Sequence, residues 1–180
     1  GVRRNLPDIE CFLKEKLNPV YKAHYAVWVY WWPLWRSLYS KRHILRKWQQ
    51  INLVREGQTF LDYGCGTGCF TLPAARIVSI KGKVYALDYY PRQLEIVAGK
   101  SKKEGLTNIE PILSGSHTGL PDNHIDVIWM CDVLHEIKER RVVLEELHRV
   151  LKKDGILALY DGMKDRALEY TGGLFSLTER

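Results

Sequence analysis

The stretch Phe60-Leu61-Asp62-Tyr63-Gly64-Cys65-Gly66-Thr67-Gly68 decides how the rest of the chain is interpreted. It is a short apolar run with an acid near its end, followed by three glycines at alternate positions. A helix-compatible run from Cys69 to Val78 comes next. A strand, a glycine turn and a helix in this order place backbone N–H groups and a helix N-terminus beside one ligand. Glycine suits such a turn because it tolerates positive φ and lets a ligand approach the backbone closely.

Strand-like and helix-like segments alternate from Thr59 onward, which indicates an α/β fold with a central parallel sheet. In such sheets, ligands bind beyond the carboxyl ends of the strands. Asp62, Asp88, Asp132 and Asp161 lie at or near the ends of expected strands, so we expect one shared site there. The expected strands are Thr59–Tyr63, Lys83–Asp88, Asn108–Leu113, Asp126–Cys131 and Ile156–Tyr160, and the expected helices are Cys69–Val78, Pro91–Glu104 and Glu139–Leu151.

The residues around the glycine turn indicate which ligand it holds. A dinucleotide fingerprint reads G-x-G-x-x-G, and Cys69 stands where its last glycine would fall. Asp62 precedes the first glycine by two residues, where it favours an ammonium group over a pyrophosphate. Asp88 ends the second expected strand, and its carboxylate can accept hydrogen bonds from both hydroxyls of a ribose. The pattern therefore favours a nucleoside with a cationic amino-acid tail.

S-adenosylmethionine (SAM) fits this description, and the chain resembles the class I SAM-dependent methyltransferases from about Val54 to Asp161. Leu61–Gly68 matches the first motif of the family almost position for position. The later segments that match are Leu120–Ile128, Val133–Ile137 and Leu144–Gly155. The chain is most similar to the small-molecule branch that includes quinone-biosynthesis and arsenite-type methyltransferases. The resemblance implies a Rossmann-like, doubly wound, mostly parallel sheet with helices on both faces.

The resemblance also implies the residues that bind the cofactor, which leaves as S-adenosylhomocysteine (SAH). Gly64 and Gly66 would let the methionine part lie against the turn, and Asp62 would organise its amino group. Asp88 would bind the ribose, and Tyr89 would pack on the adenine. The full set of expected cofactor residues is Asp62, Gly64, Cys65, Gly66, Gly68, Asp88, Tyr89, Ser116 and Cys131.

The sequence departs from the family pattern in two places. The family often has an acid facing the adenine amine, whereas Ser116 and His117 follow Gly115 here, and we interpret His117 as a packed ring. The family sheet has the strand order 3-2-1-4-5-7-6, with strand 7 antiparallel. Residues Gly173–Thr178 predict strand 6, which leaves no residues for strand 7.

The chemistry expected of the protein follows from the cofactor. A sulfonium methyl is already electrophilic, so the protein mainly aligns a nucleophile with the S–CH3 bond and removes a proton from it where needed. The candidate catalytic residues are His135, Glu136 and Asp132, which follow the fourth expected strand. His135 has the pKa best suited to a base near neutrality, but it serves equally well as a residue that orients the cofactor or packs. We expect no bound metal, because no Asn follows Asp161.

Residues 1–52 form a predicted helical, aromatic-rich segment in front of a methyltransferase domain at 53–180. The run Ala23–Trp35 has no formal charge, but it is too short for the roughly 20 residues of a membrane span. We interpret it as core packing or as a lid over the ligand. Contact of residues 23–48 with a membrane surface is the alternative, since Trp and Tyr favour interfaces and the basic stretch Lys41–Lys47 follows. That stretch is equally consistent with an anionic partner or with a solvated helix face.

The expected activity is SAM-dependent methyl transfer to a small, apolar or quinone-like acceptor. A methyltransferase acting on RNA or protein is an alternative prompted by the net charge of +6, although nucleic acid is the less favoured partner. A non-catalytic SAM-binding module is another alternative. The four cysteines form no C-x-x-C pair, which indicates reduced thiols and a cytoplasmic location.

Overall fold

The computed structural model describes residues 41–42, 44–160 and 175–176. The chain divides into two compact units, residues 1–47 and 48–180. The boundary expected after residue 52 stays a prediction. The N-terminal helix, the aromatic run and its proposed lid or membrane contact lie outside the described residues, apart from the helical residues 41–42 and 44–50.

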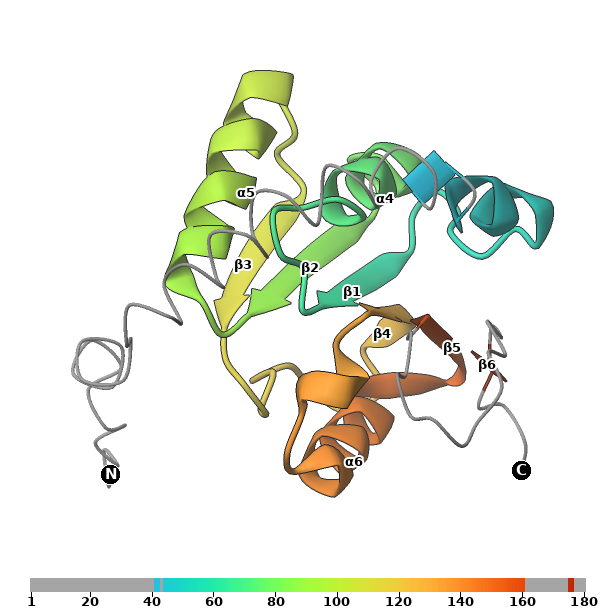
Figure 1. Cartoon of the computed structure of the whole chain (residues 1–180). Helices are drawn as coiled ribbons and strands as arrows, with labels where there is room; N and C mark the ends of the chain where they lie inside the picture. Colours follow the sequence, from blue (N-terminus) through green and yellow to red (C-terminus); the bar gives the residue numbers. More distant parts are fainter. Residues whose placement is uncertain (1–40, 43, 161–174, 177–180) are drawn as a thin grey trace. The chain divides into compact units, whose positions relative to one another are not determined.

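A parallel sheet forms the centre of the second unit, which confirms the predicted α/β class (Figure 1). Its order is β3-β2-β1-β4-β5-β6, and the first five strands run parallel. The order reverses between β1 and β4, which is where ligands bind in doubly wound sheets. The strands are β1 Thr59–Tyr63, β2 Lys83–Asp88, β3 Ile109–Leu113, β4 Ile125–Cys131, β5 Leu151–Tyr160 and β6 Phe175–Ser176. The helices are α4 Thr71–Val78, α5 Pro91–Glu104, α6 Arg140–Val150 and the short 3-10 turn η2 Leu134–Glu136.

The sixth strand corrects one expectation. Its two residues pair antiparallel with β5, through Ala158 with Ser176 and Leu159 with Phe175. In the family order, the antiparallel neighbour of strand 5 is strand 7. The described part of Gly173–Thr178 therefore takes the position of strand 7 and not that of strand 6.

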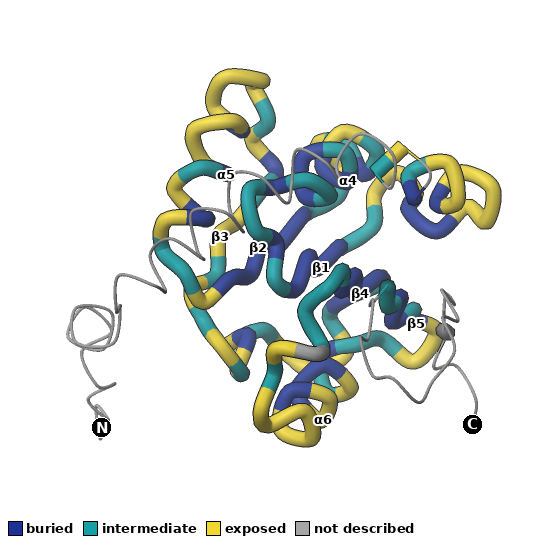
Figure 2. The backbone as a smooth tube through the Cα atoms, viewed as in Figure 1, coloured by how far each residue is buried: buried dark blue, intermediate teal, exposed yellow. Residues whose placement is uncertain are grey.

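The helices cover the two faces of the sheet. Leu61 and Tyr63 of β1 pack in one core cluster with Val143 and Leu147 of α6. The alternate residue Asp62 points to the other face, where it contacts the first residue of α4. Figure 2 shows that burial is concentrated on the central strands, while the outer turns of α5 and α6 are exposed. The alternation places the acid of the glycine motif on the α4 face.

An aromatic cluster packs Trp48 against the sheet within the second unit. The indole of Trp48 is 1% exposed and lies edge-on to Trp129 of β4, with ring centroids 4.9 Å apart. Phe60 of β1 and Phe70, which precedes α4, lie 5.5 and 5.4 Å from Trp48. Aromatic rings contribute large buried areas, so this cluster is expected to be a main source of stability on this face.

We predict that Trp48→Ala lowers the free energy of unfolding by about 3–5 kcal/mol, because it leaves a cavity between Phe60, Phe70 and Trp129. Chemical denaturation of the full chain measures the loss. The control is Ile80→Ala, whose side chain is 86% exposed, and its effect should stay within about 0.5 kcal/mol. Equal effects of the two substitutions would contradict the packing described here.

Candidate functional site

The glycine turn is bonded to the end of β2. The N–H groups of Gly64 and Cys65 both donate to the carbonyl oxygen of Leu87, at 2.8 and 2.9 Å. The N–H of Gly66 donates to Oδ2 of Asp88 at 2.9 Å. Gly64, Gly66 and Gly68 have φ values of 74°, 51° and 82°, a region that L side chains rarely adopt. The three glycines therefore allow a turn that follows the carboxyl edge of the sheet.

Asp88 stands at the centre of these contacts. Its Oδ1 accepts a hydrogen bond of 2.9 Å from the N–H of Tyr90, while its Oδ2 accepts that of Gly66. The residue is 6% exposed, and burial raises the pKa of its carboxyl above the usual value. The backbone donors oppose this shift because they stabilise the charged form. Each oxygen keeps lone-pair capacity for a further donor.

Asp62 lies beneath the turn and is 2% exposed. Its Oδ2 accepts a hydrogen bond of 2.6 Å from the hydroxyl of Thr71, at the start of α4. Burial, with a smaller contribution from the charge of Asp88, raises the pKa of Asp62 to about 7. The site thus holds two buried acids, and neither forms an ion pair with a cation of the described residues.

Two neighbouring side chains restrict the turn from its sides. A Cβ added at Gly64 would lie 2.4 Å from Cγ2 of Val133, so the loop after β4 packs directly against this glycine. A Cβ at Gly68 would lie 3.1 Å from Cγ2 of Val97 on α5. The thiol of Cys65 belongs to a buried cluster that includes Val97, and burial raises its pKa. The thiol of Cys65 thus lies in the core, and the predicted contact of Cys65 with the cofactor stays a prediction.

The expected adenine side of the site lies between the end of β2 and the loop after β3. A Cβ at Gly115 would lie 3.8 Å from Cβ of Tyr89, so these two residues are neighbours. Tyr89 is 50% exposed, and its ring lies 3.8 Å from that of Tyr90. The hydroxyl of Tyr63 donates to the carbonyl oxygen of Gly115 at 2.8 Å. Burial, and to a lesser extent the charge of Glu146, raise the pKa of Tyr63 to about 12.

The loop after β3 is also attached to α6. Glu146 accepts hydrogen bonds at Oε1 from the N–H and the hydroxyl of Thr118, at 2.8 and 2.7 Å. Arg149 donates to both carboxylate oxygens of Glu146 and to the carbonyl oxygen of Leu120. The hydrogen bond from Arg149 is the largest cause that lowers the pKa of Glu146 to about 2. His117 is 73% exposed at 3.9 Å from Glu146, so the packed ring expected there is wrong.

These attachments place Ser116 in the loop held by Tyr63 and Glu146, where it is half-buried. Sequence reasoning did not identify Tyr63 or the Glu146 contacts. The i, i+3 spacing of Glu146 and Arg149 on a helix was an available signal for their ion pair. No sequence signal indicates that the hydroxyl of Tyr63 reaches Gly115, because this hydrogen bond joins residues 52 positions apart.

The predicted catalytic residues follow β4. Cys131 and Asp132 are half-buried, and the N–H of Asp132 donates to the carbonyl oxygen of Tyr160 at 2.7 Å. Asp132 has a φ of 61°, an uncommon conformation for a residue other than glycine. Glu136 lies in η2 and is exposed. Burial is the main cause that raises the pKa of Tyr89, and the charge of Glu136 is one of the smaller causes. His135 lies in η2, but its side chain and Asp161 are outside the described residues. The backbone thus brings the β4 loop beside the glycine turn, while the catalytic roles stay predictions.

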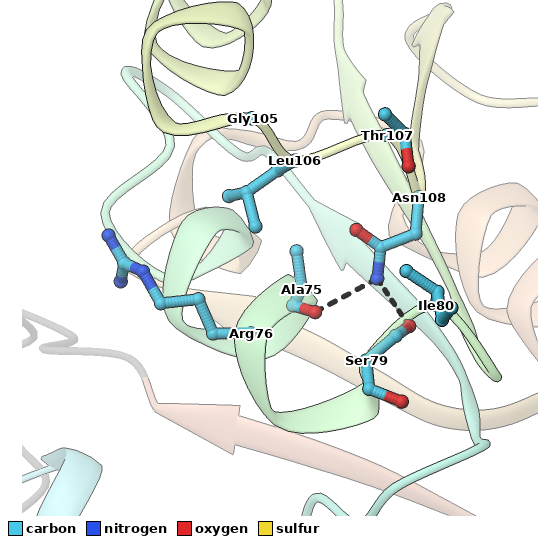
Figure 3. A pocket seen from close by; sticks show the side chains of 8 residues that line it. All are labelled: Ala75, Arg76, Ser79, Ile80, Gly105, Leu106, Thr107 and Asn108. Atoms are coloured by element: carbon cyan, nitrogen blue, oxygen red, sulfur yellow. Dashed lines mark hydrogen bonds between the residues drawn. The ribbon is translucent and has the colours of Figure 1, made fainter.

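A separate hollow of about 210 Å³ lies at the opposite edge of the sheet, where α4 and α5 end (Figure 3). The side-chain amide of Asn108 donates to the carbonyl oxygens of Ala75 and Ser79 there, at 2.9 and 2.7 Å. This hollow is therefore distinct from the glycine turn. Within the described ranges, no group of three His, Cys, Asp or Glu residues is placed to hold a metal ion. The helices of the same ranges also lack the length and apolarity needed to cross a membrane.

Comparison with known families gives the class of this chain. A family model described as a methyltransferase domain matches residues 61–159, which include the last three residues of β1, the glycine turn and β4. A solved SAM-dependent methyltransferase from Aquifex aeolicus is 34% identical, with a TM-score of 0.64, and the match covers 76% of this chain and 71% of that one. The chain therefore belongs to the methyltransferase-domain family, the class I SAM-dependent methyltransferases.

Two further relatives indicate the range of acceptors in this family. Demethylmenaquinone methyltransferase of Geobacillus stearothermophilus is 34% identical over 122 residues, which are 64% of this chain and 51% of that protein. The chain spans about half the length of the curated relatives it matches. Coclaurine N-methyltransferase, solved with N-methylheliamine and SAH bound, is 26% identical with a TM-score of 0.60, and the match covers 67% of this chain and 35% of that one.

We predict that Gly64→Ala destabilises the fold by at least about 2 kcal/mol, because Ala strains the left-handed conformation and its Cβ meets Val133. Chemical denaturation measures the loss. The matched control is Gly99→Ala, which meets no atom within 4 Å on α5 and should stabilise the chain by about 0.5–1 kcal/mol. The double variant Gly64→Ala/Val133→Ala should lose less than the sum of its two single variants. Strict additivity would show that these residues are not in contact.

We predict that Glu146 makes stability depend on pH in acid. Its pKa is about 2 in the folded chain and 4.5 in the reference state, so the folded chain binds fewer protons between these values. Its contribution, at most about 3 kcal/mol, is complete above pH 4.5 and is lost as the pH falls towards 2. Denaturation curves of Glu146→Gln across this range should lack that dependence. Glu145→Gln, at an exposed site, should keep it, and an unchanged acid profile of Glu146→Gln would refute the assignment.

Proposed function

We propose that this chain binds SAM at the glycine turn and transfers its methyl group to a small, quinone-like acceptor. The observation that carries the proposal is the pair of buried acids, Asp62 and Asp88, on either side of a turn whose glycines allow close approach. Buried carboxylates without a cationic partner are costly, and a ligand that brings donors and a positive charge offsets this cost. SAM supplies both, through its ribose hydroxyls and its amino group.

The residues present fit this ligand part by part. Asp88 has lone pairs available for ribose hydroxyls while it keeps its hydrogen bonds to Gly66 and Tyr90. Asp62 offers negative charge beneath the turn, and the ionised form gains when an ammonium group comes near. Tyr89 is half-exposed beside the loop after β3, and its ring face is available to a purine. Ser116 and the backbone of Cys65 and Cys131 complete the proposed contacts.

When bound, SAM supplies an electrophilic methyl group, and the contribution of the chain is to orient the acceptor and exclude water. The residues after β4 are suited to orienting the acceptor, because Val133 packs on Gly64 and so places this loop beside the glycine turn. We assign His135, Glu136 or Asp132 the removal of a proton from the acceptor. The uncommon φ of Asp132 supports a functional role, since such conformations are concentrated at active sites.

The class of acceptor rests on the relatives. Demethylmenaquinone methyltransferases are among the curated proteins that this chain matches, and an apolar aromatic acceptor agrees with the aromatic composition of residues 23–35. We place the protein in the cytoplasm, with the segment of residues 23–48 contacting a membrane surface, where apolar quinones reside, although Trp48 itself is buried in the core. RNA, protein and the absence of any acceptor are the alternative outcomes of the test.

The test is a methyl-transfer assay with isotope-labelled SAM on a demethylated quinone, on a small-molecule extract, on RNA and on protein. We predict label in the quinone or the small-molecule fraction. Label only in RNA or protein would refute the acceptor class. Calorimetric binding of SAM without label in any fraction would identify a non-catalytic module.

Binding itself is tested with Asp88→Asn. We expect at least a tenfold loss of SAM affinity by calorimetry, because a hydrogen bond to a charged group contributes about 1.5–3 kcal/mol. The matched control is Asp154→Asn, at an exposed position of β5, which should bind SAM as the unmodified chain does. Thermal unfolding of both variants reports whether the turn is intact. Equal affinity of Asp88→Asn and the unmodified chain would overturn the proposed cofactor site.

A further inference from the structure

Gln93 carries a buried acceptor that the fold itself does not use. The residue lies in the first turn of α5 and is 7% exposed, and its Oε1 has no hydrogen-bond partner among the described residues. Two other buried side-chain atoms of these residues share this property, and both are indole nitrogens of the aromatic cluster, Trp48 and Trp129. Gln93 is the one that lies close to the proposed cofactor site.

A buried amide oxygen without a donor costs free energy, because it loses its hydrogen bonds to water and gains none in return. An apolar residue at the same position would avoid this cost. The neighbouring buried positions of α5, Leu94 and Val97, are apolar. The polar group at Gln93 therefore requires a donor that the described chain lacks.

The geometry of α5 shows where this acceptor lies. Residues 93, 97 and 100 fall on one face of a helix, four and three positions apart. Val97 would touch a Cβ at Gly68, and Nζ of Lys100 donates to the carbonyl oxygen of Thr67 at 2.7 Å. This face of α5 therefore borders the glycine turn. Of these three residues, Gln93 lies nearest to the start of α5. It is therefore also the nearest of the three to Asp88, which ends the strand before this helix.

The backbone gives a second, independent placement. The N–H of Gln93 donates to the carbonyl oxygen of Tyr90 at 3.0 Å. The N–H of Tyr90 in turn donates to Oδ1 of Asp88, the acid assigned to the ribose. The backbone of Gln93 is thus two hydrogen bonds from Asp88, and its helical spacing with Val97 and Lys100 puts it on the face of α5 that borders the turn.

We propose that Gln93 is a specificity-determining residue for the cofactor, and that its Oε1 accepts a hydrogen bond from a ribose hydroxyl. The inference rests on the proposed function, because it requires a ribose beside Asp88. A ribose diol offers two donors, and each oxygen of Asp88, which already accepts one backbone N–H, keeps capacity for one more. Gln93 provides a further acceptor, and it makes the site select a ribonucleoside over a deoxynucleoside.

The test compares the unmodified chain with Gln93→Leu by calorimetric titration of SAH, 2′-deoxy-SAH and 3′-deoxy-SAH. For Gln93→Leu we expect about a tenfold weaker binding of SAH. The loss should shrink to less than threefold for the analogue that lacks the partner hydroxyl, which identifies whether the 2′ or the 3′ group is bound. Thermal unfolding of ligand-free Gln93→Leu should occur at the same or a higher temperature, because the unpaired oxygen is gone.

The other possible results of this titration either support or overturn the proposed role of Gln93. The control Lys103→Leu, at an exposed position of the same helix, should bind all three ligands as the unmodified chain does. Unchanged SAH affinity of Gln93→Leu, or an equal loss for all three ligands, would overturn the role of Gln93. A lowered unfolding temperature with unchanged affinity would show a structural role only. If the unmodified chain itself failed to bind SAH, the proposed function would fail first, and the two failures are thereby distinguishable.

Discussion

The hydrogen bonds that attach the glycine turn to the end of β2 are the constraint on which the site depends. Two of them end on the carbonyl oxygen of Leu87 and one on the carboxylate of Asp88. They replace the ladder bonds that β1 would continue if it did not turn, so the backbone polar groups remain paired while the chain changes direction. The same contacts hold Asp88 in place, so the turn and the acid form one unit.

The sequence predicts much of this arrangement, because local rules determine it. β1, β2 and α5 have the bounds expected from their apolar runs, Pro91 and Gly105. β3 begins at Ile109, one residue later than expected, while the side-chain amide of Asn108 binds the end of α4. β5 begins earlier than expected, at Leu151, because it pairs with β4 across a break between Ile125 and Val127 that a hydropathy pattern does not reveal.

The contacts that shape the ligand side of the site were not predictable in this way. Tyr63 occupies an ordinary strand position, and only the packing of the whole sheet brings its hydroxyl to the loop after β3. Thr118 and Glu146 are 28 residues apart and meet because α6 returns along the sheet. Such contacts depend on tertiary geometry, in which sequence distance carries little information. The motif therefore defines the turn at which we propose that the cofactor binds, while the distant contacts hold the loop beside that turn.

The packing of Val133 on Gly64 has a consequence for how this family can vary. The turn proposed to bind the methyl donor and the loop proposed to face the acceptor share one contact with no spare volume. Position 64 is restricted to glycine by its φ of 74° as well as by this contact, so a larger side chain at position 133 could not be accommodated by a change at position 64. New acceptors would then be accommodated through exposed positions of that loop, such as Glu136, and not through the residue that seals it against the turn.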